Sequence, residues 1–203
     1  MRDYPKTATL RDGRTVVLRA LAHGDSDKLY AFFQALPEEG RLFLRHDVED
    51  PALIRHWTDG IDFEHVIPLI AEDGDRIVAD GTLHIETHSW MRHVGLIRLV
   101  IAETHRSVGL GTLITRELIA IAEERGLEKL QVHVIEDDRG QVKLFQLLGF
   151  ETVAVLKDLV KDQKGNSRNL AIMINDVTNL GRIVEDWIND SMIPAFRVPG
   201  AGA

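Results

Sequence analysis

A glycine-containing turn between a strand pattern and a helix pattern constrains this chain more than any other feature. Residues 94–102 (VGLIRLVIA) are typical of a strand, and from Leu110 onward apolar residues recur at helical spacing. The turn joining them consists of Arg106, Ser107, Val108, Gly109, Leu110, Gly111 and Thr112. Glycines let the main chain approach a ligand closely, and the N–H groups of a first helical turn bind anions. The sequence therefore predicts a phosphate or pyrophosphate site at residues 106–112.

The remaining patterns predict an α/β fold. Strand patterns occur at residues 15–20, 66–71, 77–87, 94–102, 130–135, 152–160 and 169–174, and helix patterns at 24–36, from 51, at 110–126 and at 141–148. The short segment 89–92 favours an antiparallel hairpin between two of the strands. The expected architecture is a mixed central sheet of about seven strands with flanking helices.

The length favours one domain with an appendage. A chain of 203 residues that is 44% apolar has ample material for one core, which we place in residues 1–176. In residues 177–203 an apolar stripe at helical spacing predicts a C-terminal amphipathic helix followed by a loose tail. The stripe comprises Val177, Leu180, Ile183, Val184, Trp187, Ile188 and Met192. This helix packs either on its own domain or on a second subunit, which would make a homodimer.

Composition argues against several classes of function. The chain has no cysteine, which excludes a thiol nucleophile, and its formal net charge of −8 disfavours nucleic acid as a partner. No apolar run is long enough for a signal peptide or a membrane span, so we expect a cytoplasmic protein that does not bind membranes. His84 and His88 would lie about 13 Å apart on a strand, too far to share an ion, and we expect no metal site.

The glycine turn, together with Leu147-Leu-Gly-Phe150 and the order of elements, resembles the GCN5-related N-acetyltransferase (GNAT) family over roughly residues 14–176. The resemblance implies acetyl-CoA or another acyl-CoA as donor, with its pyrophosphate on the main-chain amides of residues 106–112. The pantetheine arm would pair with the preceding strand around Ile101. The implied reaction is acyl transfer to an amine. Segment 36–45 also loosely resembles the acetyltransferase domain of the bacterial Pat-type protein-lysine acetyltransferases. The implied acceptor is therefore either a protein lysine or a small amine.

The chain departs from the family pattern at the positions that usually carry proton transfer. Where many members have a tyrosine that protonates the departing thiolate, this chain has Phe145, and Asp138 replaces a common asparagine. The glutamate that serves as general base in related enzymes would fall at Gly95 or Leu96. Neither the usual acid nor the usual base is present.

The neighbouring strand offers replacement bases. Asp80, Thr82, His84 and Glu86 alternate with apolar residues, which predicts one polar face. If residues 89–92 form the turn, Glu86 faces Gly95 and His84 faces Ile97, so Glu86 or His84 becomes the expected proton acceptor. The alternative is that this polar face is merely exposed to solvent.

Two other functions fit parts of the pattern. An acyl-CoA sensor that kept the cofactor site but lost catalysis would also lack the tyrosine and the glutamate. A Rossmann-type nucleotide binder would need a parallel sheet, and the expected hairpin at 89–92 argues against it.

Overall fold

A computed structural model describes residues 4–37, 41, 44, 48–162 and 164–177. The predicted C-terminal helix therefore lies outside the described residues except for Val177. Most of the segment 36–45, which suggested the Pat-type acetyltransferases, also lies outside them.

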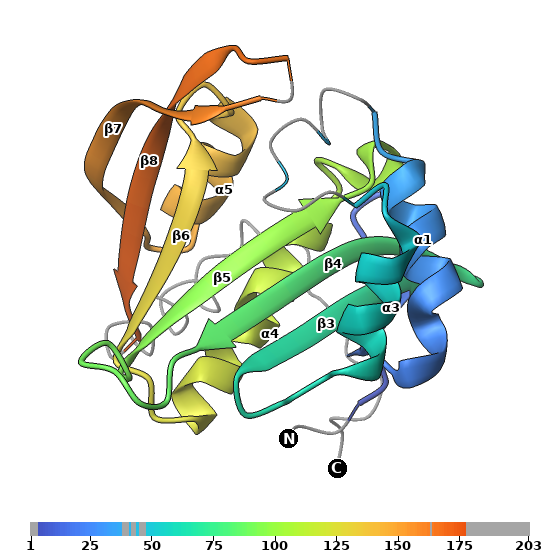
Figure 1. The fold of residues 1–203 in the computed structure, drawn as a ribbon. Helices are drawn as coiled ribbons and strands as arrows, with labels where there is room; N and C mark the ends of the chain where they lie inside the picture. Colours follow the sequence, from blue (N-terminus) through green and yellow to red (C-terminus); the bar gives the residue numbers. More distant parts are fainter. Residues whose placement is uncertain (1–3, 38–40, 42–43, 45–47, 163, 178–203) are drawn as a thin grey trace.

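The fold is α/β, built on a mixed sheet whose strands run in the order β1-β2-β3-β4-β5-β6-β8-β7 (Figure 1). The strands are β1 Lys6–Thr9, β2 Thr15–Ala20, β3 Val66–Asp73, β4 Arg76–Ile85, β5 Val94–Ile101, β6 Lys129–Ile135, β7 Glu151–Lys161 and β8 Ser167–Asp176. β5 and β6 are parallel, and every other neighbouring pair is antiparallel. The predicted mixed sheet is confirmed, with β1 as an additional strand.

Helices cover both faces of the sheet (Figure 1). α1 Ser26–Gln34 and α3 Pro51–Asp59 pack on one face through a cluster that includes Phe32, Phe33, Ile54 and Ile70. On the other face, α4 Leu110–Glu124 and α5 Arg139–Leu147 share the larger core with the inward residues of the sheet. The strands in the middle of the sheet therefore have α1 and α3 on one side and α4 and α5 on the other.

The first turns of two helices have side-chain caps that explain where the helices begin. Asp50 accepts a hydrogen bond from the N–H of Ala52, and Pro51 occupies the first helical position of α3. Asp138 accepts a hydrogen bond from the N–H of Gln141 at the start of α5. The carboxylate at position 138 therefore has a structural role, which an asparagine would fill equally well.

Candidate active site

The glycine turn lies between β5 and α4. A short 3-10 turn, Glu103–His105, follows β5, and Gly109 then takes a left-handed conformation (φ +93°) as the N-cap of α4. The N–H of Arg11 donates to the Val108 carbonyl over 3.0 Å, which ties the turn to the loop between β1 and β2. The first N–H groups of α4 have no acceptor within the helix, because the helix begins at Leu110. An anion at this end would meet those groups and the positive end of the helix dipole.

Two residues of the turn have packing roles that the sequence did not reveal. Leu110 is fully buried, and Gly111 lies inside the first turn of α4 rather than in a surface loop. A Cβ at Gly111 would come within 2.9 Å of the side chains of Ile101 and Leu144. A larger residue at position 111 would therefore disturb the fold, because this glycine lets α4 pack closely on β5 and α5.

The charged and titratable residues around the turn differ in their exposure to solvent. His105 is buried, and its Nε2 lies 3.1 Å from Asp73 Oδ2 and 2.9 Å from Arg14 Nη1. Arg106 and Glu103 are exposed. Because His105 is held by groups from other loops, Arg106 is the better placed of the two cations to meet an anion at the turn.

The parallel pair β5 and β6 separates just before the glycine turn. Their ladder runs from Val94 opposite Lys129 only to Ile97 opposite Val132, although β5 continues to Ile101 and β6 to Ile135. Figure 1 shows the two arrows diverging toward this end. Among the described residues, the last part of β5 therefore has a ladder partner only in β4. Its other main-chain edge can pair with an extended ligand lying between the strands.

A polar face lies beside this separation, on the side of the sheet that carries α1 and α3. Thr82 and His84 of β4 are half-buried there, with Thr82 Oγ1 3.0 Å from His84 Nε2. Arg98 of β5 and the pair Gln131 and His133 of β6, whose nitrogens are 2.7 Å apart, lie on the same side. The predicted polar face is present and extends over three strands.

The family model for the GNAT acetyltransferases matches residues 28–150, which is more than half of the chain and includes both the turn and the separated strands. The chain belongs to the GNAT acetyltransferase family.

Three proteins illustrate what this GNAT chain is similar to. An uncharacterised N-acetyltransferase of Bacillus subtilis, YobR, is 33% identical over 60 residues, which span 30% of this chain and 24% of YobR. The GNAT domain of S. lividans PAT superposes with a TM-score of 0.70 at 18% identity, covering 86% of this chain and 99% of that domain. RimJ of Mycobacterium smegmatis, solved with CoA-disulfide, reaches a TM-score of 0.71 at 15% identity, covering 91% and 95%. These structural likenesses show the GNAT fold.

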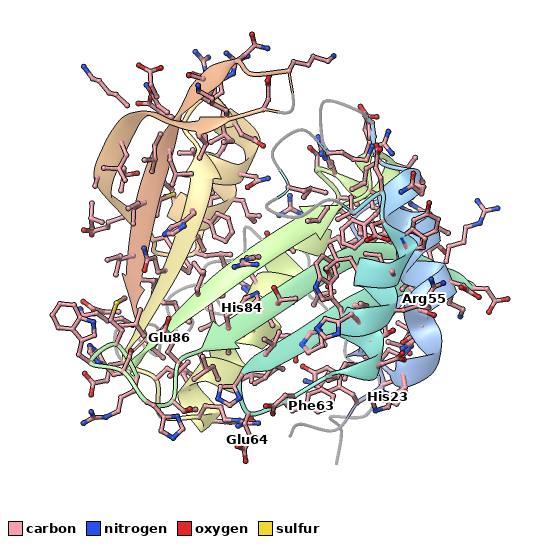
Figure 2. The ribbon with its side chains drawn as sticks, viewed as in Figure 1. His23, Arg55, Phe63, Glu64, His84 and Glu86 are labelled. Atoms are coloured by element: carbon pink, nitrogen blue, oxygen red, sulfur yellow. The ribbon has the colours of Figure 1, made fainter. Side chains whose placement is uncertain are left out.

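The hairpin between β4 and β5 does not have the register expected from the sequence. Ile85 pairs with Gly95 and His84 with Leu96, so the expected pairs are wrong by one residue. This register is centred on Trp90, and two successive turns connect the strands, with hydrogen bonds from Arg92 N–H to the Ser89 carbonyl and from Val94 N–H to the Met91 carbonyl. Glu86 lies beyond the end of β4 and is exposed, whereas His84 lies within the strand (Figure 2).

Gly95 is not an empty base position. It faces the core under α4, where a Cβ would come within 2.7 to 2.9 Å of the side chains of Leu83, Leu127 and Leu130. Leu96 points to the opposite, polar side together with His84. In this GNAT chain a carboxylate at position 95 could not reach the polar side of the sheet.

Phe145, at the usual tyrosine position of the family, is a core residue. Its side chain is 2% exposed, and its ring meets Phe150 edge-on with the centroids 5.3 Å apart. A hydroxyl added there would enter packed apolar surroundings, so a tyrosine at this position would have a steric cost.

Asp80 is the residue that the sequence reasoning missed. It lies on the polar side of β4, and its Oδ1 is buried with no hydrogen-bond partner among the described residues. Burial raises the pKa of Asp80 to about 7. The available signal was an acid inside the otherwise apolar run Ile77-Val-Ala-Asp80-Gly81, which we counted only as part of the alternating face.

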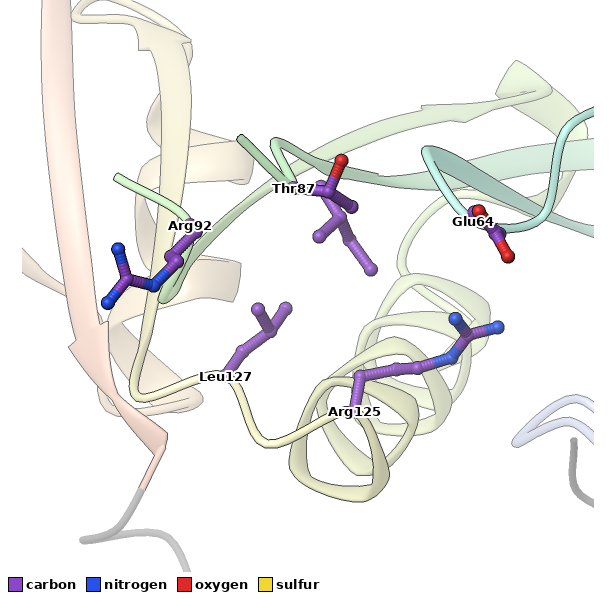
Figure 3. A pocket seen from close by; sticks show the side chains of 6 residues that line it. Glu64, Thr87, Arg92, Arg125 and Leu127 are labelled. Carbon is purple, nitrogen blue, oxygen red and sulfur yellow. The ribbon is translucent and has the colours of Figure 1, made fainter. Parts of the chain in front are cut away.

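A surface hollow lies away from the glycine turn. It lies beside the C-terminal end of α4 (Figure 3) and is lined by Glu64, Ile85, Thr87, Arg92, Arg125 and Leu127. The glycine turn is at the other end of this 15-residue helix, about 21 Å away. The hollow is therefore separate from the candidate cofactor site.

Two statements about membrane spans and metal ligands hold for the part of the chain that the structure describes. No helix in it is long and apolar enough to cross a membrane. It also contains no group of three or more His, Cys, Asp or Glu side chains that could hold a metal ion.

Proposed function

We propose that this GNAT chain transfers an acyl group, acetyl above all, from acetyl-CoA to a primary amine. One observation carries the proposal: the glycine turn that opens α4 directly follows the part of β5 whose outer edge is left open by β6. A pyrophosphate needs the first feature and an extended amide-containing arm needs the second, and coenzyme A contains both in that order.

The residues present fit this donor. The amides of Val108 to Thr112 would bind the pyrophosphate, with Arg106 and Ser107 exposed beside them. The open edge near Ile101 would pair with the pantetheine arm. YncA of Salmonella typhimurium, solved with acetyl-CoA, shares the fold with a TM-score of 0.68 at 15% identity, covering 80% of this chain and 94% of that one. This likeness supports the choice of acetyl-CoA.

The acceptor is proposed to be a protein lysine or a small amine. Such amines are cations at neutral pH, and a protein with a formal net charge of −8 attracts them. The amine would approach over the polar side of β4, β5 and β6, because the half-buried polar side chains of Thr82 and His84 lie there and the opposite side is apolar core.

Of the two proton acceptors expected from the sequence, Glu86 and His84, one is better placed than the other. Glu86 stays a candidate, but it is exposed and lies beyond β4. His84 is half-buried on the polar side, and Thr82 orients its ring. We therefore favour His84 of these two.

A turnover assay tests the proposal. Acetyl-CoA is supplied with a panel of small amines and lysine-bearing proteins, and released thiol is measured with a chromogenic disulfide. The chain has no cysteine, so the protein itself contributes no thiol signal. Turnover with any amine supports the proposal. Binding of acetyl-CoA without turnover of any acceptor would contradict it and favour an acyl-CoA sensor.

Two expectations from the sequence stay predictions alongside this function. A cytoplasmic location is testable by fractionation of cells that express the chain. A homodimer formed through residues 177–203 is testable by comparing the solution mass of the full chain with that of a chain ending at Asp176.

A further inference from the structure

Asp80 occupies an unusual place in the sheet. In the ladders it lies opposite Ile70 of β3 on one side and opposite Val100 of β5 on the other. Val100 belongs to the part of β5 beyond Ile97, where the ladder to β6 has ended. Paired residues on neighbouring strands point to the same side, and neighbouring strands are about 4.8 Å apart. The carboxyl group is therefore one strand away from the edge at which an acyl-CoA arm would bind.

Among the residues that the structure describes, the groups packed around Asp80 do not neutralise it. The inward residues of α1 that cover this side are Leu29, Phe32 and Phe33, which are all apolar. Arg19 and Glu72, on the β2 and β3 side, bind each other over 2.6 Å.

The charged or titratable groups toward β5 do not neutralise it either. They are Arg98, which faces Thr82 in the ladder, and His84 further along β4. Neither forms an ion pair with Asp80. Burial is the sole cause that raises the pKa of this carboxyl to about 7.

We propose that Asp80 accepts the proton of the amine substrate, directly or through one water, in place of the glutamate that is missing from β5. The inference rests on the proposed acyltransferase function. A group of this kind suits the task because a general base works best when its pKa lies near the working pH. A carboxylate without a hydrogen-bond partner also keeps its acceptor capacity for a substrate.

The proton balance of the step is closed. The amine arrives as an ammonium ion and gives one proton to Asp80. The nitrogen lone pair then attacks the thioester carbonyl, the C–N bond forms, and the C–S bond breaks. The nitrogen loses its second proton as the amide forms, and the thiolate takes up a proton to become the thiol. Asp80 returns its proton to solvent, so each turnover releases one proton.

The kinetic test compares three variants with the wild type on an amine found in the panel. Asp80→Asn removes the titrating carboxyl group and keeps almost the same side-chain shape. Asp75→Asn is the control and removes an exposed carboxylate from the turn between β3 and β4. His84→Gln removes the imidazole. We expect Asp80→Asn to lower kcat/KM by roughly 10²- to 10⁴-fold near neutral pH. The acid limb of its pH profile should disappear, and the deficit should shrink as the pH approaches the amine's own pKa, near 10.4 for lysine. Asp75→Asn should behave as the wild type does.

A second measurement needs no turnover. In infrared difference spectra of the unliganded wild type against Asp80→Asn, the protonated carboxyl band should vanish with a midpoint at about pH 7. A midpoint in the ordinary range of aspartate, about pH 4, would overturn the inference. So would unchanged kcat/KM in Asp80→Asn, or an acid limb that His84→Gln abolishes and Asp80→Asn retains. Each of these results leaves the acyltransferase function standing, whereas a wild type that turns over no amine overturns both.

Discussion

At the scale of single residues, the side of the sheet that a side chain faces decides what it can do. Asp80 and Gly95 belong to adjoining strands, but Asp80 points to the polar side and Gly95 into the core under α4. Counted back from the glycine turn, Gly95 is one of the two positions at which the family resemblance predicts a glutamate. The carboxylate that the structure has on the polar side belongs to β4, on the side where we propose that the amine approaches.

The titration of Asp80 should appear in the stability of the unliganded protein. Its pKa is raised to about 7 in the folded chain and is near 3.9 in an unfolded one. Between these values the folded state holds a proton that the unfolded state has released, so stability should fall as pH rises from about 4 to about 7. Asp80→Asn should lack this fall and gain up to a few kcal/mol over the wild type above pH 7. Urea unfolding at several pH values measures it, and parallel curves for the two proteins would contradict the assignment.

Positions 95 and 96 should respond oppositely to the same substitution. Gly95→Glu would force a carboxylate against Leu83, Leu127 and Leu130, and we expect a loss of more than about 4 kcal/mol or no folding. Leu96→Glu places the carboxylate on the half-buried polar side beside His84, so we expect a loss of roughly 1–2 kcal/mol. Thermal unfolding compares the two variants. Equal stabilities would mean that the orientation of β5 is wrong.

At the scale of elements, a cluster of ion pairs joins β2, β3 and the start of α1. Arg19 binds Asp25 and Glu72, each over 2.6 Å, and hydrogen bonds from Arg19 hold the pKa of both carboxyls below their usual range. Lys28 of α1 also reaches Glu72, over 3.0 Å. Because α1 covers the side of the sheet that carries Asp80, this cluster helps to position one wall of the candidate acceptor site.

Removal of Arg19 should therefore loosen this wall. In Arg19→Met, Asp25 and Glu72 lose the guanidinium between them, and we expect a loss of roughly 3–5 kcal/mol at neutral pH. Lys28→Met, a control at an exposed position, should cost less than about 1 kcal/mol. The two depressed carboxyl pKa values stabilise the fold above about pH 4, so the difference between wild type and Arg19→Met should shrink as the pH falls below that range. A pH-independent difference would show that packing, not charge, is lost.

At the scale of the whole molecule, the candidate cofactor site bridges the two parts of the sheet. β1 to β5 form one side, and β6, β8 and β7 form the other, with the short β5–β6 ladder between them. A ligand inserted at the open end of this ladder contacts both parts. Binding should therefore stabilise the fold as a whole.

Coenzyme A should raise the melting temperature accordingly. At a concentration about 100-fold above Kd the gain is about 2.7 kcal/mol, which corresponds to several degrees for a chain of this size. Gly109→Ala strains the left-handed N-cap of α4 and should reduce this shift, whereas Gly165→Ala, an equally left-handed glycine in the β7–β8 turn, should leave it unchanged. Differential scanning fluorimetry measures both. Equal shifts in the two variants would exclude the glycine turn as the anion site.

The sequence by itself determined most of the elements of this protein, with β1 as an exception, and the place of its glycine turn. Hydrophobic period, the cap at Asp50 and the glycine at position 109 act over a few residues, so they can be interpreted without a structure. The motifs were also sufficient for the GNAT family, because they lie within one strand–turn–helix unit and its successor.

Only the tertiary structure decided which side chains meet. The insertion of β8 between β6 and β7, the one-residue difference in the β4–β5 register and the early end of the β5–β6 ladder arise from pairing between distant segments. A shift of one residue moves a side chain to the other face, so Glu86 lost its expected position and Gly95 became a core residue. The burial that raises the pKa of Asp80 likewise arises in tertiary packing, in which α1 lies against β4, and no local pattern in the chain encodes it.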